Sequence, residues 1–230
     1  KKNLQQSERL LQNILPPVIQ RRLKSGESPI ADDHPCVTVV FSALINFDTY
    51  SKKLEAREFV VFLNNLMVTF DDIVDQLDLE KIKTIGDVYF LCGGLTKKTS
   101  KDHALRAMEC ALMFMEALQE FNVRHGTTNL KLRIGLQTGA AVAGVIGSTK
   151  VAYDLWGDTV NTSSRMQSTG VPDRIQVHEK TYLWLKDYFA FDDNYVEAKG
   201  KGKLKTYLYS CRKGLPSPHA GKVNWRKTMQ

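Results

Sequence analysis

An asparagine and an arginine lie four residues apart in the sequence YDLWGDTVNTSSRM, at positions 153–166. The surrounding pattern predicts a helix over Asp158–Gln167, with Asp158 as its N-cap. Residues four apart share one face of a helix, so we expect Asn161 and Arg165 to lie side by side. An amide and a guanidinium placed in this way could hold a ribose and a charged phosphate. The alternative is a pair of exposed polar residues without a ligand.

A lysine, a glycine and an acid lie close together in the sequence KIKTIGDVY, at positions 81–89. Gly86 and Asp87 separate two short apolar runs, a pattern typical of a β-hairpin. Because side chains alternate along a strand, we expect Lys83 near the hairpin turn and Asp87 at its tip. Taken alone, this segment fits an exposed hairpin with ordinary charges better than a binding site.

Lysine and glycine alternate in the sequence AKGKGKLKTY, at positions 198–207. This composition predicts a flexible cationic loop ahead of a strand. Glycines let a backbone approach a phosphate closely, and lysines supply positive charge. The alternative is a basic hairpin loop that binds nothing.

The remaining periodicity predicts the elements that must position these segments. Cys36–Phe41 is a β-branched apolar run typical of a buried strand, and Glu55–Leu77 and Asp102–Phe121 carry apolar residues at helical spacing. The order of strands and helices predicts an α+β domain with a ferredoxin-like core, in which helices pack on one face of an antiparallel sheet. Asp154 is expected in an irregular segment. Further strands are expected at Lys81–Ile85, Val88–Cys92, Leu130–Thr138, Ala141–Ile146 and Lys205–Ser210.

The chain divides into three parts. Residues 1–30 form a linker with a heptad-like apolar stripe, which Pro16 and Pro17 interrupt. The stripe predicts a short coiled-coil-like helix before the domain, or alternatively a single amphipathic helix packed on it. Residues 36–211 form the main domain, and residues 212–230 form a basic tail that we expect to be disordered. The members of the stripe are Leu4, Leu11, Ile14 and Val18.

The net charge of +7 is concentrated in the tail. The tail holds five of the 32 basic residues and no acidic ones, which leaves 27 basic residues against 25 acidic ones. A nearly neutral body without stacking aromatics on its expected strands argues against a nucleic-acid partner. No apolar run reaches the length of a membrane span, so we expect membrane contact only through regions outside this sequence. Four cysteines without a CxxC pair fit a reducing, cytoplasmic setting.

Taken together, these segments resemble the class III adenylyl and guanylyl cyclase catalytic domain. The resemblance covers Cys36–Tyr209 and rests on KIKTIGD, LRIGLQTG with AVAGVIG, WGDTVNTSSRM followed by STG, and KGKGKLKTY, all in family order. The sequence LLQNILPPVIQRRLKSG also resembles the linker of receptor-type and soluble guanylyl cyclases. The resemblance implies two metal ions, Mg²⁺ or Mn²⁺, and attack of a ribose 3′-hydroxyl on the α-phosphate with loss of pyrophosphate. It also implies a dimer, in which one subunit holds the metals and the other the base and ribose.

The resemblance gives roles to three of the residues already singled out. Asn161 would orient the ribose. Arg165 would stabilise the charge that develops at the α-phosphate. Lys199, the first lysine of KGKG, would contact the polyphosphate.

The same resemblance makes Lys83 and Asp154 the residues that read the base, with Leu155 beside them. Adenine presents an acceptor at N1 and a donor amine at N6, which a lysine and an aspartate match. Guanine reverses both, and guanylyl cyclases typically carry Glu and Cys at these two positions. The pair therefore predicts ATP, on a body and linker that resemble those of a guanylyl cyclase. Two substitutions, natural or engineered, could convert one specificity into the other.

The resemblance breaks at the end of the first strand. The family typically has FADIVGFT there, and this chain has FSALINFD at positions 41–48. Ala43 stands in place of a metal-binding Asp, whereas Asp87 keeps the second metal carboxylate. Asn46 replaces a Gly and is expected to crowd a phosphate-binding loop, and Asp48 is expected to add repulsion. The residues of that loop are Leu44, Ile45, Asn46 and Phe47.

A similar division of the site occurs in the second catalytic domain of mammalian adenylyl cyclase, which lacks the metal carboxylates. We therefore predict conversion of ATP to cyclic AMP by a heterodimer, with this chain as the base-reading subunit beside a metal-competent cyclase subunit. One alternative is a weak homodimeric cyclase that uses Asp87 alone, helped by Mn²⁺. Another is a nucleotide-binding pseudo-cyclase, although intact Asn161 and Arg165 argue against it, because a pure binder has little use for transition-state groups.

Overall fold

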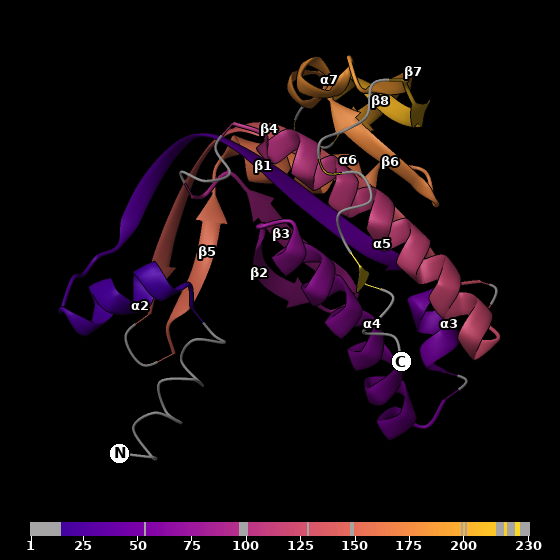
Figure 1. The fold of residues 1–230 in the computed structure, drawn as a ribbon, viewed down its shortest axis with the longest axis horizontal. Helices are drawn as coiled ribbons and strands as arrows, with labels where there is room; N and C mark the ends of the chain where they lie inside the picture. Colours follow the sequence, from indigo (N-terminus) through magenta and orange to yellow (C-terminus); the bar gives the residue numbers. More distant parts are fainter. Residues whose placement is uncertain are drawn as a thin grey trace.

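The computed structural model describes residues 15–52, 54–96, 101–127, 129–147, 150–198, 200, 202–214, 219 and 224–225. Within them, one mixed β-sheet carries the helices (Figure 1). The elements in chain order are α2 (Pro17–Lys24), β1 (Ala31–Ile45), α3 (Phe47–Ser51), α4 (Ala56–Gln76), β2 (Glu80–Ile85), β3 (Val88–Gly93), α5 (His103–His125), β4 (Lys131–Ile146), β5 (Ala152–Trp156), α6 (Asp158–Ser168), β6 (Arg174–His178), α7 (Glu179–Leu185), β7 (Phe189–Ala198) and β8 (Gly202–Arg212).

The sheet has the order β2-β3-β1-β4-β6-β8-β7, with β5 paired to β4 outside this path. All neighbouring strands are antiparallel except β4 and β6. Consecutive residues of β1 serve opposite faces: Val40 belongs to the large core under α4 and α5, and Val39 to a smaller cluster beside Val160 of α6. The α+β class predicted from the sequence is confirmed, and α6 covers the second face of the sheet.

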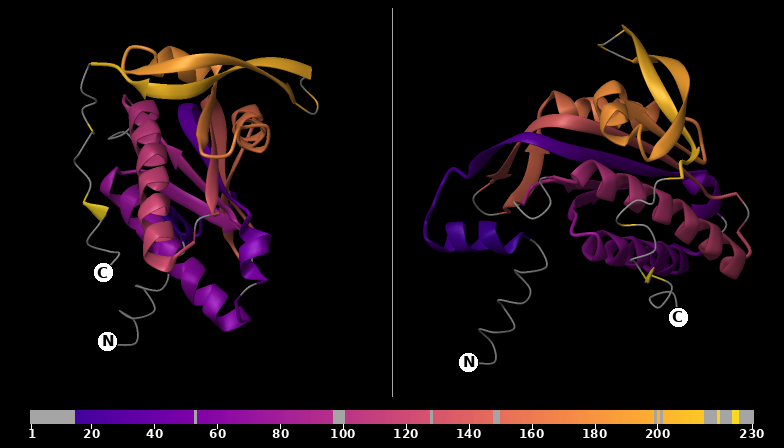
Figure 2. Two further views of the ribbon diagram at one scale, coloured as in Figure 1. Left: turned by 90° about the vertical axis from the view of Figure 1, so that its right-hand side faces the viewer. Right: turned by 45° about the horizontal axis from the view of Figure 1, so that its top comes forward.

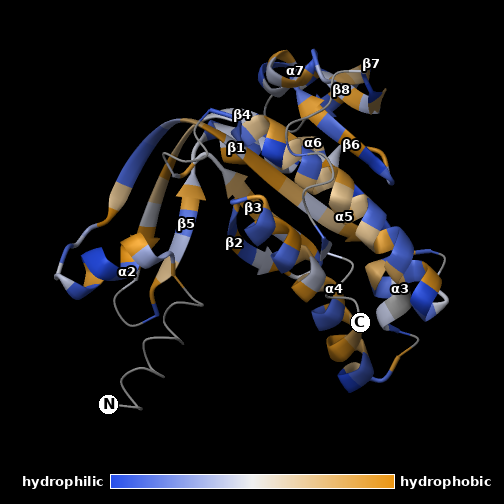
Figure 3. Ribbon diagram, viewed as in Figure 1, coloured by the Kyte–Doolittle hydropathy of each residue, from blue (hydrophilic) through white to orange (hydrophobic). Residues whose placement is uncertain are grey.

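The large core forms because α4 and α5 each turn an apolar stripe towards the sheet. In α4, Leu66, Phe70 and Ile73 recur at helical spacing and are at most 1% exposed. Phe70 stacks on Phe114 of α5 with 3.9 Å between ring centroids. Figure 3 shows the resulting alternation of hydrophobic and hydrophilic bands along both helices. Each buried side chain of this size stabilises the fold by about 2 kcal/mol.

Strand β4 differs from the sequence prediction, which placed two strands around Gly139. It is a single strand of 16 residues, and Gly139 lies within it opposite Val37 of β1. The glycine is needed for space, because a Cβ there would lie 2.6 Å from the hydroxyl of Thr159 in α6. The segment around Asp154 is likewise regular and forms β5, since it pairs along the continuation of β4.

Part of the sheet extends beyond the large core as an outer arm. We use this name for residues 31–36 of β1, residues 141–146 of β4, strand β5 and helix α2. Figure 1 shows the arm curving away from α4 and α5, and Figure 2 shows it from two further sides. None of residues 31–36 is buried, although Leu15, Ile19 and Ile30 are 3–4% exposed where the linker packs on the arm.

The linker helix α2 begins at Pro17, the second residue of the proline pair. Proline suits the first turn of a helix because its missing N–H has no partner there in any case. Residues 1–14, which hold most of the predicted apolar stripe, lie outside the described part of the chain. Strand β1 starts at Ala31, five residues before the predicted domain boundary at position 36. Among the described residues, no helix is long and apolar enough to cross a membrane.

The described residues of the C-terminal segment lie on the domain, whereas the sequence predicts a disordered tail. Arg212 ends β8 and forms two 2.6 Å hydrogen bonds with the fully buried Glu109 of α5. Trp225 is 2% exposed and belongs to the large core. His219 contacts Asp102 at the start of α5 with an Nε2–Oδ2 distance of 2.8 Å. These contacts hold the described residues of the segment against the domain, a role that their charge composition does not indicate.

Candidate functional site

Lys83 and Asp154 contact each other in the folded chain. The Nζ atom of Lys83 in β2 donates a hydrogen bond to Oδ2 of Asp154 in β5. The two strands are not neighbours in the sheet, so this ion pair bridges the gap between the β2 edge and the outer arm. The Asp154 side chain is 21% exposed and that of Lys83 is 41% exposed, so a ligand can reach both.

The Asp154 carboxylate is also held from its own strand. The backbone N–H of Leu155 donates to Asp154 Oδ1 over 2.9 Å, so each carboxylate oxygen has one donor. Strand alternation turns the Leu155 side chain the other way, into the smaller cluster, where it is 3% exposed. Leu155 can therefore meet a base only through its backbone.

Helix α6 is anchored to the sheet by buried hydroxyl groups. Ser163 donates to the carbonyl oxygens of Val39 (2.8 Å) and Gly135 (3.1 Å), and Thr159 donates to that of Ala140 (2.6 Å). At Gly135 a Cβ would lie 2.1 Å from the backbone nitrogen of Gln167. The glycine thus lets the helix backbone lie directly on β4, and the hydroxyls fix the rotation of the helix.

This anchoring turns Asn161 and Arg165 away from the sheet. Asn161 is exposed and Arg165 is half-buried, and neither side chain has a hydrogen-bonding partner among the described residues. Asp158 does not cap the helix as predicted. Gly157, at φ 135°, is the N-cap, and Asp158 lies in the first turn, where its charge complements the helix dipole.

The two predicted metal positions lie close together at the end of β1. Ala43 pairs with Val88, the residue that follows Asp87 at the hairpin tip, and the N–H of Leu44 donates to the Asp87 carbonyl oxygen over 3.1 Å. Position 43, however, carries only a methyl group, which is 3% exposed. No group of three or more potential metal ligands occurs in the described part of the chain. The residues present therefore do not fit a two-metal site.

The chain turns within residues 44–47, the predicted phosphate loop. Asn46 adopts φ 67°, a left-handed conformation that asparagine tolerates better than most residues. Its side chain does not crowd the loop as expected but donates from Nδ2 to the Asn129 carbonyl oxygen over 2.8 Å. Ile45 pairs with Lys131, and Phe47 packs edge-on against Phe59. The remaining predicted phosphate contact, Lys199, lies outside the described residues.

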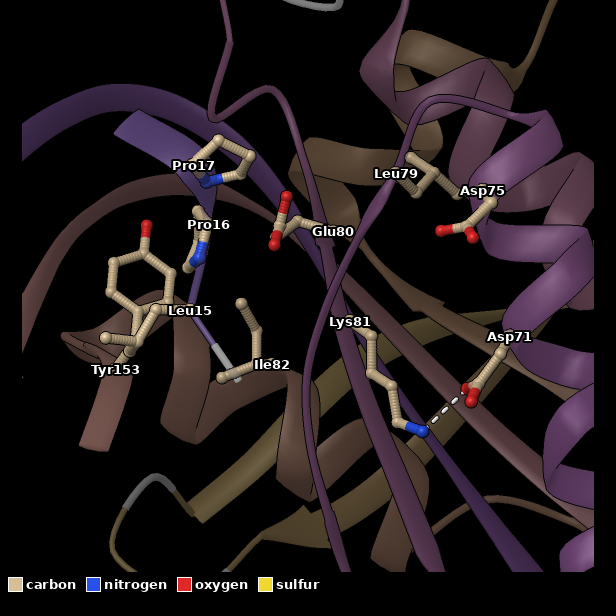
Figure 4. Close-up of a pocket in the computed structure, with 10 residues that line it drawn as sticks. All are labelled: Leu15, Pro16, Pro17, Asp71, Asp75, Leu79, Glu80, Lys81, Ile82 and Tyr153. Carbon is tan, nitrogen blue, oxygen red and sulfur yellow. Dashed lines mark hydrogen bonds and ion pairs between the residues drawn. The ribbon is translucent and has the colours of Figure 1, made fainter. Parts of the chain in front are cut away.

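A cleft of about 470 Å³ lies between the linker, α4, β2 and β5, and Lys83 and Asp154 are not among its lining residues (Figure 4). It is lined by Ile82 and Tyr153, which directly precede the two paired residues, and by Leu15–Pro17 of the linker. Burial, followed by the nearby charge of Asp75, raises the pKa of Glu80 in this cleft to about 7. Glu80 is not among the residues predicted from the sequence; the available signal was an acid that directly follows the apolar Leu79 and precedes the expected strand Lys81–Ile85.

Comparison with known proteins places this geometry in a family. The family model of the adenylate and guanylate cyclase catalytic domain matches residues 30–210. The receptor-type guanylate cyclase gcy-28 of Caenorhabditis elegans is 39% identical over 218 residues, which cover 93% of this chain and 17% of that protein. The chain spans 17–20% of the length of the curated relatives it matches.

Solved structures show the same similarity. The guanylate cyclase domain of RhGC from Catenaria anguillulae, in complex with GTP, is 34% identical with a TM-score of 0.73, covering 79% of this chain and 100% of that one. The catalytic core of a rhodopsin-guanylyl cyclase with converted specificity, in complex with ATPαS, is 35% identical with a TM-score of 0.72, covering 79% and 98%.

Proposed function

The chain belongs to the adenylate and guanylate cyclase catalytic-domain family, and on that premise we propose that it converts ATP to 3′,5′-cyclic AMP and pyrophosphate as the base-reading subunit of a dimer. The observation that carries the choice of ATP is the ion pair between Lys83 and Asp154. The choice of a dimer with a second kind of subunit rests on Ala43. A cytoplasmic location of the domain is part of the same proposal.

Base selection would use both members of the ion pair. The Nζ of Lys83 donates to adenine N1, and the carboxylate of Asp154 accepts from the N6 amine. Because the two groups already lie together, N1 and the N6 amine, which are adjacent on the same edge of adenine, can be read without a large movement. Guanine would set its N1–H against the ammonium and its O6 against the carboxylate, which leaves two mismatched pairs.

The reaction itself would use the outward face of α6. Asn161 orients the ribose so that its 3′-oxygen faces the α-phosphorus. The new bond between the 3′-oxygen and the α-phosphorus forms as the bond from that phosphorus to the bridging oxygen of the β-phosphate breaks. The 3′-hydroxyl proton passes to water, and pyrophosphate carries away the bonding electrons. Arg165 stabilises the negative charge on the α-phosphate oxygens during this exchange. Neither side chain has a hydrogen-bonding partner within the described part of the chain, which keeps both available for substrate.

Metal binding is assigned to the partner subunit. One carboxylate, that of Asp87, stands where the family has two, and a methyl group at position 43 cannot coordinate a cation. A heterodimer with a metal-competent cyclase domain would contain one complete site, formed by that domain's metal ligands and this chain's Lys83, Asp154, Asn161 and Arg165.

GTP cyclisation is the second candidate. It is supported by the names of the curated relatives, which are guanylate cyclases, and by the GTP bound to the RhGC domain. GTP cyclisation would require Lys83 and Asp154 to read guanine. The lysine donor would then face the N1–H donor and the aspartate acceptor would face the O6 acceptor, so the groups do not match.

The deciding experiment restores the carboxylate. We expect Ala43→Asp to raise Mn²⁺-dependent cyclic AMP formation by the isolated chain at least about tenfold, because a missing metal ligand limits turnover. ATP and GTP are compared side by side at equal concentration. A gain restricted to cyclic GMP would overturn the choice of ATP, and high activity of the unmodified chain alone would overturn the need for a partner. Ala56→Asp, at the exposed start of α4, adds the same side chain without burying a charge and is a control that should show no gain.

A further inference from the structure

We propose that Arg22 of the linker helix is a positioning residue for base selection, because it fixes the outer arm that carries Asp154. The inference rests on the proposed function for its effect on ATP, but its structural part can be tested without nucleotide. It is carried by a set of hydrogen bonds from Arg22 and by the register of three strands.

Arg22 joins the linker helix to the first strand. Its Nε lies 2.9 Å from both carboxylate oxygens of Glu27, and its NH2 lies 2.6 Å from Glu27 Oε1. The same guanidinium donates from NH1 to Asp32 Oδ2 over 2.5 Å and from NH2 to Asp32 Oδ1 over 2.9 Å. A planar guanidinium shared by two carboxylates fixes direction as well as distance. The last turn of α2, the turn after it and the start of β1 are thus held as one unit.

The register of the arm continues from Asp32 to the base-reading residue. Asp32 of β1 is paired with Ala143 of β4, and Ala143 is paired with Leu155 of β5. The N–H of Leu155 holds one oxygen of Asp154. One row across three strands therefore connects the Arg22 clamp to the carboxylate that faces Lys83.

The neighbouring row of paired residues, which contains Asp154 itself, is also held at the point where the linker meets β4. The N–H of Val145 donates to the Ile30 carbonyl oxygen over 3.0 Å, and Ala31 is paired with Gly144, which is paired with Asp154. A Cβ on Gly144 would lie 2.6 Å from the Ile30 oxygen, so the linker and β4 touch through their backbones. Any shift of the linker is transmitted to β4 at this point.

Besides the clamp, few large buried side chains support the arm: Leu15, Ile19 and Ile30 where the linker packs on it, and Leu155 of β5. Residues 31–36 of β1 contribute no buried side chain, and β5 pairs only with β4 among the described strands. A segment held by few buried contacts opens locally at low free-energy cost, so one clamp can decide its order. Loss of the clamp should let Asp154 move relative to Lys83, which lies on the separate β2–β3 hairpin.

The test compares Arg22→Gln with Arg21→Gln, a matched control on the same helix whose side chain is exposed. Amide hydrogen exchange is followed in the nucleotide-free chain. We expect exchange at Val145 and Leu155 to become at least about tenfold faster in R22Q and to stay within about twofold of the parent in R21Q. The core amide of Leu136 should be unchanged in both, which reports that the variants are folded. Asp32→Asn should reproduce the effect from the other end of the clamp.

The second readout is the ratio of ATP to GTP affinity, measured by equilibrium dialysis with each nucleotide. R22Q should lower this ratio at least about threefold, a change in binding that corresponds to partial weakening of one hydrogen bond to the base. Equal exchange at Val145 and Leu155 in R22Q, D32N and the parent would overturn the inference, whatever the substrate. Absence of any ATP preference in the parent chain would instead overturn the proposed function, and the exchange result would be judged separately.

Discussion

Lys83 and Asp154 lie 71 positions apart in the chain, yet their side chains form an ion pair across a gap between two strands that share no backbone hydrogen bonds. Each member keeps part of its surface exposed, and the aspartate has a second donor from Leu155. The pair is therefore pre-arranged: a base can replace or bridge the lysine–carboxylate contact without rebuilding the surrounding backbone. Pre-arrangement of this kind lowers the free-energy cost of ordering a site on binding.

Replacement of both Lys83 and Asp154 should change the preferred substrate from ATP to GTP. The double variant Lys83→Glu with Asp154→Cys replaces a donor and an acceptor by an acceptor and a weak donor, which suits guanine. We expect the ATP-to-GTP ratio of kcat/KM to fall at least about 100-fold, measured in the same partner mixture. Lys81→Gln removes a charge on the same strand, where Lys81 pairs with Asp71, and should leave the ratio unchanged. An unaltered preference in the double variant would contradict the assignment.

Removal of the Arg165 guanidinium should affect the reaction and spare the fold. Arg165→Ala is expected to lower kcat by about 100-fold or more, in line with the loss of one preorganised charge stabiliser. Its side chain has no hydrogen-bonding partner among the described residues, so thermal unfolding should shift little. Rapid-quench assays and calorimetry measure the two quantities. A large loss of stability with normal turnover would contradict a catalytic role for Arg165.

Ser163 should show the opposite behaviour. Its buried hydroxyl shares one proton between the Val39 and Gly135 carbonyl oxygens, so Ser163→Ala removes the hydrogen bond that anchors α6 to the sheet at this point. We expect a loss of about 1–3 kcal/mol in the free energy of unfolding, measured by urea denaturation. Ser164→Ala, one residue further along the same helix, serves as the control and should be close to neutral.

Stability should depend on Glu80 in a defined pH range. Burial and Asp75 raise the pKa of Glu80 from its ordinary 4.5 to about 7, so between these values the folded chain binds more protons than the unfolded chain. Stability from this group is therefore greatest below pH 4.5 and declines as pH rises to 7, by on the order of 2 kcal/mol. Glu80→Gln should remove this component of the slope in denaturation curves taken from pH 5 to 7.5. An identical slope in the variant would show that Glu80 ionises freely.

The Glu109–Arg212 pair should be costly to break from one side only. Arg212→Ala leaves a fully buried carboxylate without its two hydrogen bonds, and we expect a loss of about 3 kcal/mol in unfolding free energy. The double variant Glu109→Gln with Arg212→Gln buries no charge and should recover part of that loss. Chemical denaturation of both variants tests the difference, and equal losses would argue against a buried ionised Glu109.

The sequence by itself determined the parts of this protein that depend on local periodicity and on ordered motifs. Helical spacing put Asn161 and Arg165 on one face, and the Gly86–Asp87 turn put Asp87 at a hairpin tip. These features involve neighbouring residues, whose relative placement follows from the geometry of one element.

Only the tertiary structure decided which distant residues meet. A glycine at position 139 suggests a turn in the sequence, but Gly139 lies inside β4. A glycine is needed there because a larger residue would collide with Thr159 of α6. The Arg22 clamp, the packing of Trp225 and the contact between Lys83 and Asp154 all depend on strand register and on packing between segments far apart in the chain. Such contacts follow from long-range burial and pairing, which local residue patterns do not encode.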